Sequence, residues 1–442
     1  MKLTIKQRLL TAFTLFGMFF GAGNLIFPVH LGQLAGRNAW SAIIGFCITA
    51  VGIPILGVAA IGSTHSDGLQ SLADRVGKKY SCFFTALLYL TIGPFFAIPR
   101  CATTSFTTGV APMISLNEQA ALFIFSLLFF GFTLFFSLRP GKITVWIGKI
   151  INPVFLVFLA ILVFTALLNP TAVISSVAPA ADYEEKALFS ALIEGYGTMD
   201  AIAGLAFGII VINIIRDMGV TDDAAIAGDV LRSGIVTGAL MALIYILTII
   251  MGTQSRGVFE TSENGGIALA QISEYYLGSF GKAVLAITIT FACLKTAIGL
   301  VTSCSEAFLK LLPGRLSYKA WAVIFSAFSF AVSNVGLSAI INYSLPVLMF
   351  LYPLAITLIL LALFGKLFNH DRKVYVCVTV FTLIAALFDF LKTLPAELQE
   401  SPSLSGIIEL GRAVLPMFDL NLGWVVPSIA GLILGLILRK KS

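Results

Sequence analysis

The chain has 442 residues, of which 58% are hydrophobic and only 11% are charged, and its mean hydropathy is +0.98. A soluble domain carries roughly 25% charged residues, so this composition excludes a soluble enzyme, a nucleic-acid binder and a disordered scaffold. It leaves a polytopic helical membrane protein. The net charge is +6, and the positions of the Lys and Arg residues are informative because these residues mark the cytoplasmic side of membrane proteins.

Twelve apolar segments approach the length of about 20 residues that a membrane-spanning helix needs. They lie at 9–31, 39–62, 82–110, 119–137, 143–168, 188–215, 231–253, 282–310, 319–334, 337–364, 374–391 and 421–438. With the N-terminus placed inside, 20 of the 28 Lys and Arg fall in inner segments and six in outer ones. This asymmetry predicts an all-α protein with twelve transmembrane helices and both termini in the cytoplasm.

The connection at residues 254–281 is longer than a turn and contains an amphipathic stretch at 266–276. Two interpretations stay open for this stretch. It could be a lid that dips into an outer vestibule, or a helix that lies in the membrane interface.

Flexible residues interrupt two of the spans at mid-depth. The first span contains Gly17 to Asn24, and the sixth contains Glu194 to Asp200. In hydrocarbon an unwound backbone is tolerated only where it is buried or lines a cavity. Because the two interruptions lie in the first and the sixth span and five is an odd number, the second group of five runs opposite to the first. The pattern predicts two inverted repeats in one transport domain, at about 9–168 and 188–364, followed by accessory helices at about 374–438.

The glycines also have a simpler explanation. Gly17 and Gly21 form a GxxxG pair, which commonly allows two helices to pack closely. The matched placement of the interruptions, with Asn24 and Asp200 at the breaks, favours a central binding site instead. Gly21-x-Gly23 is not a dinucleotide-binding loop, because no strand precedes it.

Four separated motifs resemble the bacterial branched-chain amino acid:cation symporter (LIVCS) family. They lie at 16–28, 93–100, 195–200 and 292–300. More remotely, spans one and eight resemble the leucine-transporter fold of the amino acid–polyamine–organocation superfamily, a 5+5 inverted repeat often followed by two helices. The resemblance implies a multi-pass secondary transporter of the bacterial inner membrane. It would take up leucine, isoleucine and valine by symport with Na⁺ or H⁺ through alternating access.

The resemblance places the substrate between the two breaks. Unwound helix ends offer N–H groups to a carboxylate and carbonyls to an ammonium group. The implied substrate-binding residues are Phe20, Gly21, Ala22, Gly23 and Asn24 at the first break, facing the carboxylate, and Gly197, Thr198, Met199 and Asp200 at the second, facing the ammonium group. Candidates for an apolar pocket are Phe20, Phe95, Phe96, Met199 and Ile202.

The coupling cation is the least determined part of the prediction. In the leucine-transporter fold a sodium ion lies between carbonyls of the first helix and two hydroxyls of the eighth. The matching positions here are Gly17, Phe20, Lys295 and Thr296, so Lys295 stands where one hydroxyl would be. Either the Lys295 ammonium occupies or competes for the sodium position and its protonation is part of coupling, or Lys295 pairs with Glu306 or another acid and sodium still binds nearby.

Other ionisable residues also lie within or near spans. An intramembrane arginine is a functional candidate by default, and Arg100 could pair with Glu194 or Asp200 as an outer gate or as a structural ion pair. The acidic cluster at 217–229 is expected to be a wetted loop, and Asp389 receives no role.

Enzymatic activity is not expected. The three histidines lie at or beyond span ends, and no nucleophile or metal motif lies at mid-depth. The six cysteines form no CxxC pair, which argues against a zinc site or a disulfide framework. The expected partners are the three amino acids and membrane lipid, without cofactor or nucleic acid, and no metal beyond a possible Na⁺. The alternative function is a carrier of another small amino acid or an organic cation on the same fold.

Overall fold

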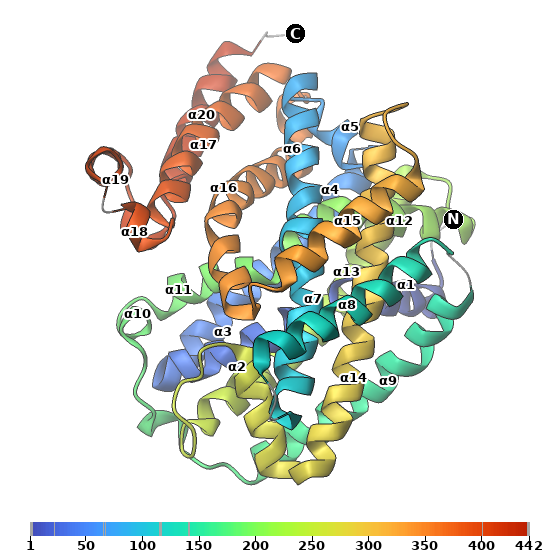
Figure 1. The fold of residues 1–442 in the computed structure, drawn as a ribbon. Helices are drawn as coiled ribbons and strands as arrows, with labels where there is room; N and C mark the ends of the chain where they lie inside the picture. Colours follow the sequence, from blue (N-terminus) through green and yellow to red (C-terminus); the bar gives the residue numbers. More distant parts are fainter. Residues whose placement is uncertain are drawn as a thin grey trace.

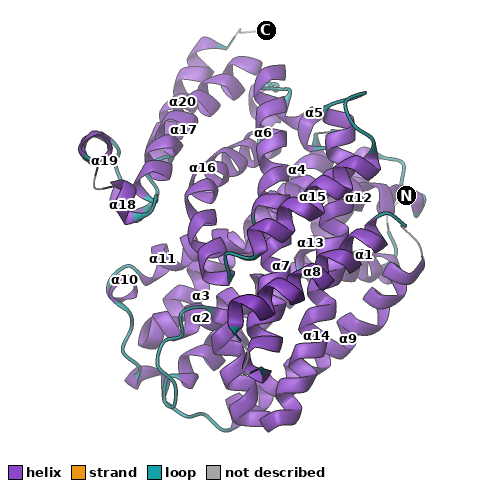
Figure 2. Ribbon diagram, in the orientation of Figure 1, coloured by secondary structure: helices purple, strands orange, loops and turns teal. Residues whose placement is uncertain are grey.

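The computed structural model describes residues 3–21, 23–64, 66, 68–114, 117–139, 142–399 and 401–439. All regular secondary structure in these residues is helical (Figure 2), and helices occur in each of the twelve predicted ranges. Among the described residues, seven helices are long and apolar enough to cross a membrane, or eight if one bent pair is a single span. The all-α fold is confirmed, whereas twelve crossings and cytoplasmic termini stay predictions.

The first five predicted ranges hold nine principal helical segments in chain order. They are α1 (Ile5–Phe19) and α2 (Gly23–Ala35); α3 (Ala39–Cys47) and α4 (Ile53–Ser63); α6 (Lys78–Leu90), α7 (Ala97–Ser105) and the π-helical turn η4 (Phe106–Val110); α8 (Glu118–Ser137); and α9 (Lys142–Leu168). Two further π-helical turns, η2 (Ile48–Gly52) and η3 (Thr91–Phe95), connect α3 to α4 and α6 to α7.

The remaining ranges hold the second half of the bundle. They are α11 (Ala187–Glu194) and α12 (Asp200–Asp217), α13 (Asp223–Ser255), α14 (Gly265–Leu311), α15 (Tyr318–Ser333), α16 (Leu337–Leu363), α17 (Arg372–Lys392) and α20 (Val425–Leu438). Short helices in the connections are α5 (Leu69–Ala73), α10 (Ala181–Glu184), α18 (Ala396–Gln399) and α19 (Pro402–Val414).

Both predicted interruptions are present. After α1 the backbone of Phe20 is extended (ψ 99°), and α2 begins only at Gly23. In the sixth range α11 passes into the 3₁₀ turn η7 (Gly195–Thr198), Met199 adopts a left-handed conformation (φ 64°), and α12 continues at 44° to the preceding helix. The sequence therefore correctly places two breaks in the first and sixth ranges.

The ends of the helices define two faces of the bundle (Figure 1). We call the side that carries the start of α1 and the ends of α12 and α14 the N-terminal face. The opposite face carries α10, α18 and the chain that leads into α14 (Figure 1). Large apolar side chains such as Phe132 and Phe164 are more than half exposed on the outer helices, as a lipid-facing surface requires.

The amphipathic stretch at 266–276 is the first part of α14, which bends at Gly278 (φ 60°). Ala268, Leu269 and Ile272 are completely buried. A Cβ added to Gly265 would lie only 1.8 Å from the carbonyl oxygen of Ile26, so the glycine lets this segment rest directly on the backbone of α2. The segment is therefore inserted against α2 rather than lying along the membrane interface, and its action as a lid stays a prediction.

Candidate functional site

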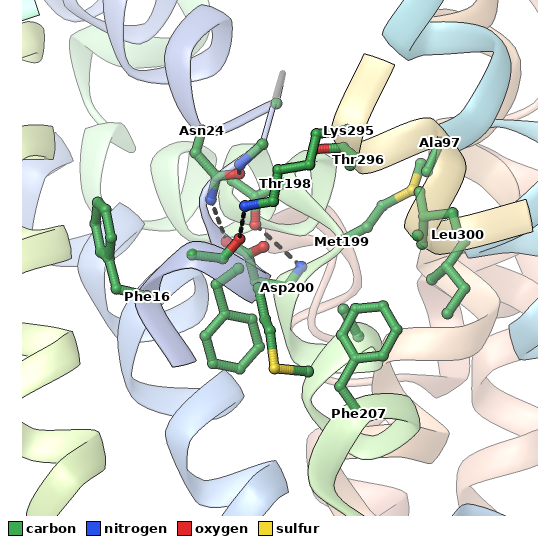
Figure 3. A pocket seen from close by; sticks show the side chains of 18 of the residues that line it. Phe16, Asn24, Ala97, Thr198, Met199, Asp200, Phe207, Lys295, Thr296 and Leu300 are labelled. Atoms are coloured by element: carbon green, nitrogen blue, oxygen red, sulfur yellow. Dashed lines mark hydrogen bonds between the residues drawn. The ribbon is translucent and has the colours of Figure 1, made fainter. Parts of the chain in front are cut away.

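A cavity of about 790 Å³ lies between the two breaks, a volume typical of small-molecule sites. Its wall comes mainly from α1 and the α1–α2 break, α7, the first half of α12 and the middle of α14, with Ile92 of η3 and Pro153 and Leu156 of α9 completing it. Figure 3 shows the polar side chains of Asn24, Thr198, Asp200 and Lys295 near its centre, with Phe207 and Leu300 beside them. The breaks thus contribute to one common space.

The cavity extends from the breaks toward the N-terminal face. Its wall there includes Leu10 and Phe13 of α1, Ile210 of α12 and Ser303 of α14. Phe13 is 60% exposed, so this end of the cavity is accessible. Toward the opposite face the lid segment of α14 rests on α2. In this conformation the site is accessible from the N-terminal face.

The first break brings most of its predicted residues to the cavity. Gly21, Gly23 and Asn24 line the wall, and the Gly21 N–H donates to Asn24 Oδ1 at 2.9 Å. The Phe20 ring instead stacks on Phe16 with centroids 4.8 Å apart and is absent from the described cavity wall. The ring lines a smaller space that adjoins the cavity at Gly17 and Gly21, so a role of Phe20 in binding stays a prediction. Ala22 lies outside the described residues.

The second break places Thr198, Met199 and Asp200 in the wall. A left-handed backbone is strained for a non-glycine residue, by roughly 1–3 kcal/mol, and Met199 adopts it between η7 and α12. Gly197 is not in the described wall: its Cα packs on the ring of Phe27, which a Cβ would approach to 2.5 Å. Its carbonyl accepts a hydrogen bond from Arg100, which lines the cavity, so the predicted role of Gly197 at the site stays a prediction.

A buried hydrogen-bond network joins the breaks. Asn24 Nδ2 donates to Asp200 Oδ2 at 2.5 Å and to the Tyr245 hydroxyl at 2.5 Å, and this hydroxyl lies 3.4 Å from Asp200 Oδ2. The three side chains belong to α2, α12 and α13 and are all buried. Sequence analysis missed Tyr245. Its signal was a single hydroxyl within the otherwise apolar stretch at 239–247.

Arg100 contacts both breaks. Its Nη1 donates to the carbonyl of Gly197 at 2.6 Å, and its guanidinium lies 5.3 Å from the ring centre of Phe27. A Cβ on Gly23 would meet its Nη2 at 2.9 Å. The ion pairs between described residues include none from Arg100 to Glu194 or Asp200, so the suggested pair is not formed here. The 3₁₀ turn presents a free carbonyl to the guanidinium instead.

Lys295 also contacts an unwound segment. Its Nζ donates to the carbonyl of Gly17 at 3.4 Å, the carbonyl that the leucine-transporter resemblance assigned to a cation. Thr296 bonds the Ala292 carbonyl of its own helix, and its methyl group faces Gly21. Glu306 lies eleven residues further along α14, about 16 Å away at 1.5 Å per residue, and it is exposed. The suggested Lys295–Glu306 pair is therefore not formed in this conformation, and the choice of coupling ion stays a prediction.

The apolar part of the wall differs from the predicted pocket. Met199 is present, with Phe16, Ala97, Ala203, Phe207 and Leu300. Phe95, Phe96 and Ile202 are absent from the described wall; Phe95 packs on Phe328 with ring centroids 5.5 Å apart. Apolar residues occur all round these helices, so composition could not determine which of them faces the cavity.

Comparison with known proteins identifies the family. The family described as branched-chain amino acid transport protein matches residues 4–442. This chain belongs to that family. Branched-chain amino acid permease BrnQ of Lactobacillus delbrueckii subsp. lactis is 50% identical over 428 residues, 96% of this chain and 95% of the relative. BrnQ of Bacillus subtilis is 40% identical over 438 residues, 99% and 98% of the two chains.

A solved structure shares the fold. The inward-facing conformation of Mhp1 superposes with a TM-score of 0.65 at 14% identity, covering 97% of this chain and 89% of Mhp1. At so low a sequence identity, the superposition shows a shared fold and nothing about function. This chain is thus a multi-pass bacterial membrane transporter and not an enzyme.

Within this transporter the site offers chemistry suited to a zwitterion. The start of α2 presents backbone N–H groups that have no acceptor within the helix. Asp200 supplies a carboxylate, and the wall beside it is apolar. No group of three or more His, Cys, Asp or Glu among the described residues is arranged to hold a metal ion.

Proposed function

We propose that this transporter takes up leucine, isoleucine and valine in symport with a proton, and that the amino acid binds between the two breaks. The relatives named as branched-chain amino acid permeases support the substrate class. The observation that carries the proposal is that Gly21, Gly23 and Asn24 share one cavity with Thr198 and Asp200.

The substrate carboxylate is proposed to bind at the start of α2. The first N–H groups of a helix lack intrahelical acceptors, and the helix dipole favours negative charge there. Gly21 and Gly23 have no side chain, so a ligand can approach the backbone closely. The ammonium group would then face Asp200 and the carbonyl groups beside Thr198.

The branched side chain is proposed to lie against Met199, Phe207 and Leu300, which line the same cavity. One methylene in an apolar pocket changes binding by only ~1–3 kcal/mol. We therefore expect overlapping uptake of the three branched amino acids. Labelled leucine uptake in the presence of each unlabelled amino acid tests this. Failure of isoleucine and valine to compete would contradict the specificity and favour another amino acid as substrate.

Alternating access is proposed to operate through the lid. Here the cavity is accessible from the N-terminal face, and the lid rests on α2 at the other side. The charge distribution of the sequence assigns the N-terminal face to the cytoplasm. The structure then corresponds to the state that releases substrate into the cell.

Lys295 is proposed to carry the coupling proton. A charged lysine far from both membrane surfaces is unfavourable, and here its Nζ has a backbone carbonyl as acceptor. Protonation would place an ammonium group beside Gly17, and deprotonation would free that carbonyl. The transported proton thus takes the place that a sodium ion would occupy.

Reconstituted protein in liposomes tests the coupling ion. We expect an imposed pH gradient to drive labelled leucine uptake without sodium. Lys295→Met should abolish this pH-driven uptake while leucine exchange across the membrane persists. Lys310→Met, at the exposed end of the same helix, is the matched control. Uptake driven only by sodium in the wild type, or pH-driven uptake retained by Lys295→Met, would overturn proton coupling.

A further inference from the structure

An arginine in the cavity wall has no anionic partner among the described residues. Arg100 of α7 is only 3% exposed and lines the cavity. The ion pairs between described residues include none that involves it. A charge that is buried within a membrane span and left uncompensated is strongly unfavourable. Arg100 therefore needs a counter-charge that the described side chains do not supply.

The contacts of the guanidinium group fix its place and leave donors available. Nη1 donates to the Gly197 carbonyl at 2.6 Å, and the guanidinium carbon lies 5.3 Å from the centre of the Phe27 ring. A guanidinium has five N–H donors, and among the described residues the Gly197 carbonyl is its one acceptor. Nη2 lies beside Gly23, since a Cβ added there would be 2.9 Å away. An anion at the start of α2 would thus lie near this side chain.

The local fold of the third span presents Arg100 to the cavity. Gly93 is non-helical (φ −103°, ψ −124°) within η3, and α7 begins at Ala97. Ala97, Arg100 and Cys101 are three and four residues apart and all line the cavity, as neighbours on one helix face do. The motif at 93–100 therefore ends in a helix whose cavity-facing side carries this arginine.

The cavity also holds a negative charge that Arg100 does not neutralise. Asp200 is 3% exposed and lies in the same wall (Figure 3). Its Oδ2 accepts from Asn24 Nδ2 at 2.5 Å, and the ion pairs between described residues include none from Arg100 to it. Lys295, the other cation of the described wall, donates to the Gly17 carbonyl. Two opposite charges that share a wall without pairing match the two charged ends of a zwitterion.

We infer that Arg100 binds the carboxylate of the transported amino acid. Its available N–H groups donate to the carboxylate oxygens beside the backbone N–H groups at the start of α2, while Asp200 faces the ammonium group. Guanidinium and carboxylate groups form strong, directional pairs of hydrogen bonds. Arg100 is then a determinant of specificity, because a ligand without a carboxylate leaves the guanidinium uncompensated. The inference rests on the proposed function, since it takes leucine as the ligand.

Calorimetric titration of the purified full-length protein with leucine and with leucinamide tests this inference. Leucinamide keeps the ammonium group and the side chain but has an uncharged amide in place of the carboxylate. We expect the wild type to bind leucine about a hundredfold more tightly than leucinamide, because a site built for a polar group rejects the analogue that lacks it. Arg100→Gln, which can still donate to the Gly197 carbonyl, should lower this ratio about tenfold by weakening leucine binding.

Two further variants complete the comparison. Arg100→Lys keeps the charge without the planar fork, so it should retain more leucine affinity than Arg100→Gln. Arg37→Gln is the matched control, because Arg37 is 53% exposed and absent from the described cavity wall. We expect it to bind both ligands as the wild type does.

Equal losses of affinity for leucine and leucinamide in Arg100→Gln would overturn the inference, because an arginine that merely joins the two breaks supports both ligands alike. If Arg100→Gln does not fold, the comparison is made with Arg100→Lys, and equal losses for the two ligands in that variant would have the same meaning. If the wild type fails to bind leucine, the proposed function is wrong. If it binds leucine and the variants keep the wild-type ratio, this inference alone is wrong.

Discussion

Asn24 and Asp200 are 176 residues apart in the chain, yet their side chains are hydrogen-bonded at 2.5 Å. Each residue lies in the first turn of the helix that follows a break. Asn24 also accepts the Gly21 N–H, so one amide ties the first break to the second. This contact fixes the spacing of the two segments that line the cavity.

Replacing Asn24 by Ala should strongly impair transport. The change leaves Asp200 and Tyr245 without their shared partner, and a buried polar group left unsatisfied costs about 1–3 kcal/mol. We expect at least a tenfold loss of labelled leucine uptake at equal protein amount. Asn169→Ala in an exposed connection is the control. Normal uptake by Asn24→Ala would show that the network is dispensable.

Replacing Gly23 by Val should block the substrate site. A Cβ at this position meets Arg100 Nη2 at 2.9 Å, and the two further methyl groups cannot fit without displacing the guanidinium from Gly197. We expect leucine binding to fall by more than tenfold while the protein remains folded, as thermal unfolding will report. Wild-type leucine affinity in this variant would contradict the placement of the site.

Replacing Gly265 by Ala should prevent the lid from closing. Its Cβ would lie 1.8 Å from a backbone carbonyl of α2, and backbone cannot move aside as a side-chain tip can. We predict that steady-state leucine uptake is nearly lost. Gly131→Ala, on a helix face with nothing within 4 Å of the added Cβ, is the matched control. Equal uptake by the two variants would argue against a lid.

Replacing Asp229 by Asn should destabilise the N-terminal segment. The buried carboxylate accepts from the Leu3 N–H at 2.7 Å and pairs with Arg8 at 3.2 Å. Losing its charge weakens both contacts, by about 1–3 kcal/mol in total. The midpoint of thermal unfolding in detergent should fall, whereas Glu185→Gln, an exposed carboxylate, should leave it unchanged. An unaltered midpoint for Asp229→Asn would contradict this anchor.

The contact between Arg75 and His370 should make stability depend on pH. The Arg75 Nη1 lies 2.6 Å from His370 Nδ1. Burial, and then the charges of Arg75 and Lys366, lower the pKa of His370 below its usual 6.5. As the pH falls, the unfolded chain therefore binds a proton at His370 before the folded protein does. The contribution of this histidine to the free energy of unfolding is complete above pH 6.5 and declines as the pH falls through the lowered pKa. His370→Gln should flatten the pH dependence of the thermal unfolding midpoint below pH 6.5. An unchanged pH profile would contradict this role of His370.

The sequence predicted the breaks because glycines at mid-depth, Asn24 and Asp200 are rare signals in apolar spans. The resemblance to the leucine-transporter fold also placed Lys295 beside the first helix, where its Nζ contacts the Gly17 carbonyl. Direction around a helix was less predictable. Phe95 packs on Phe328 instead of lining the cavity, and Tyr245 carried no motif, because side-chain orientation depends on packing against other helices.

Burial near helix ends was equally difficult to predict. Asp229 belongs to an acidic cluster that was expected to be wetted, but it is completely buried because the N-terminal segment covers it. Its partner Arg8 is 221 residues away in the chain. Contacts of this kind depend on tertiary structure, and the charge pattern of one segment carries no information about its distant partners.

The most direct test of the account is a structure of the protein determined with leucine bound. We predict leucine in the cavity, with its carboxylate at the amides of Gly23 and Asn24 at the start of α2 and its ammonium group beside Thr198 and Asp200. Leucine bound elsewhere, or first and sixth spans wound continuously through their centres in that structure, would contradict it.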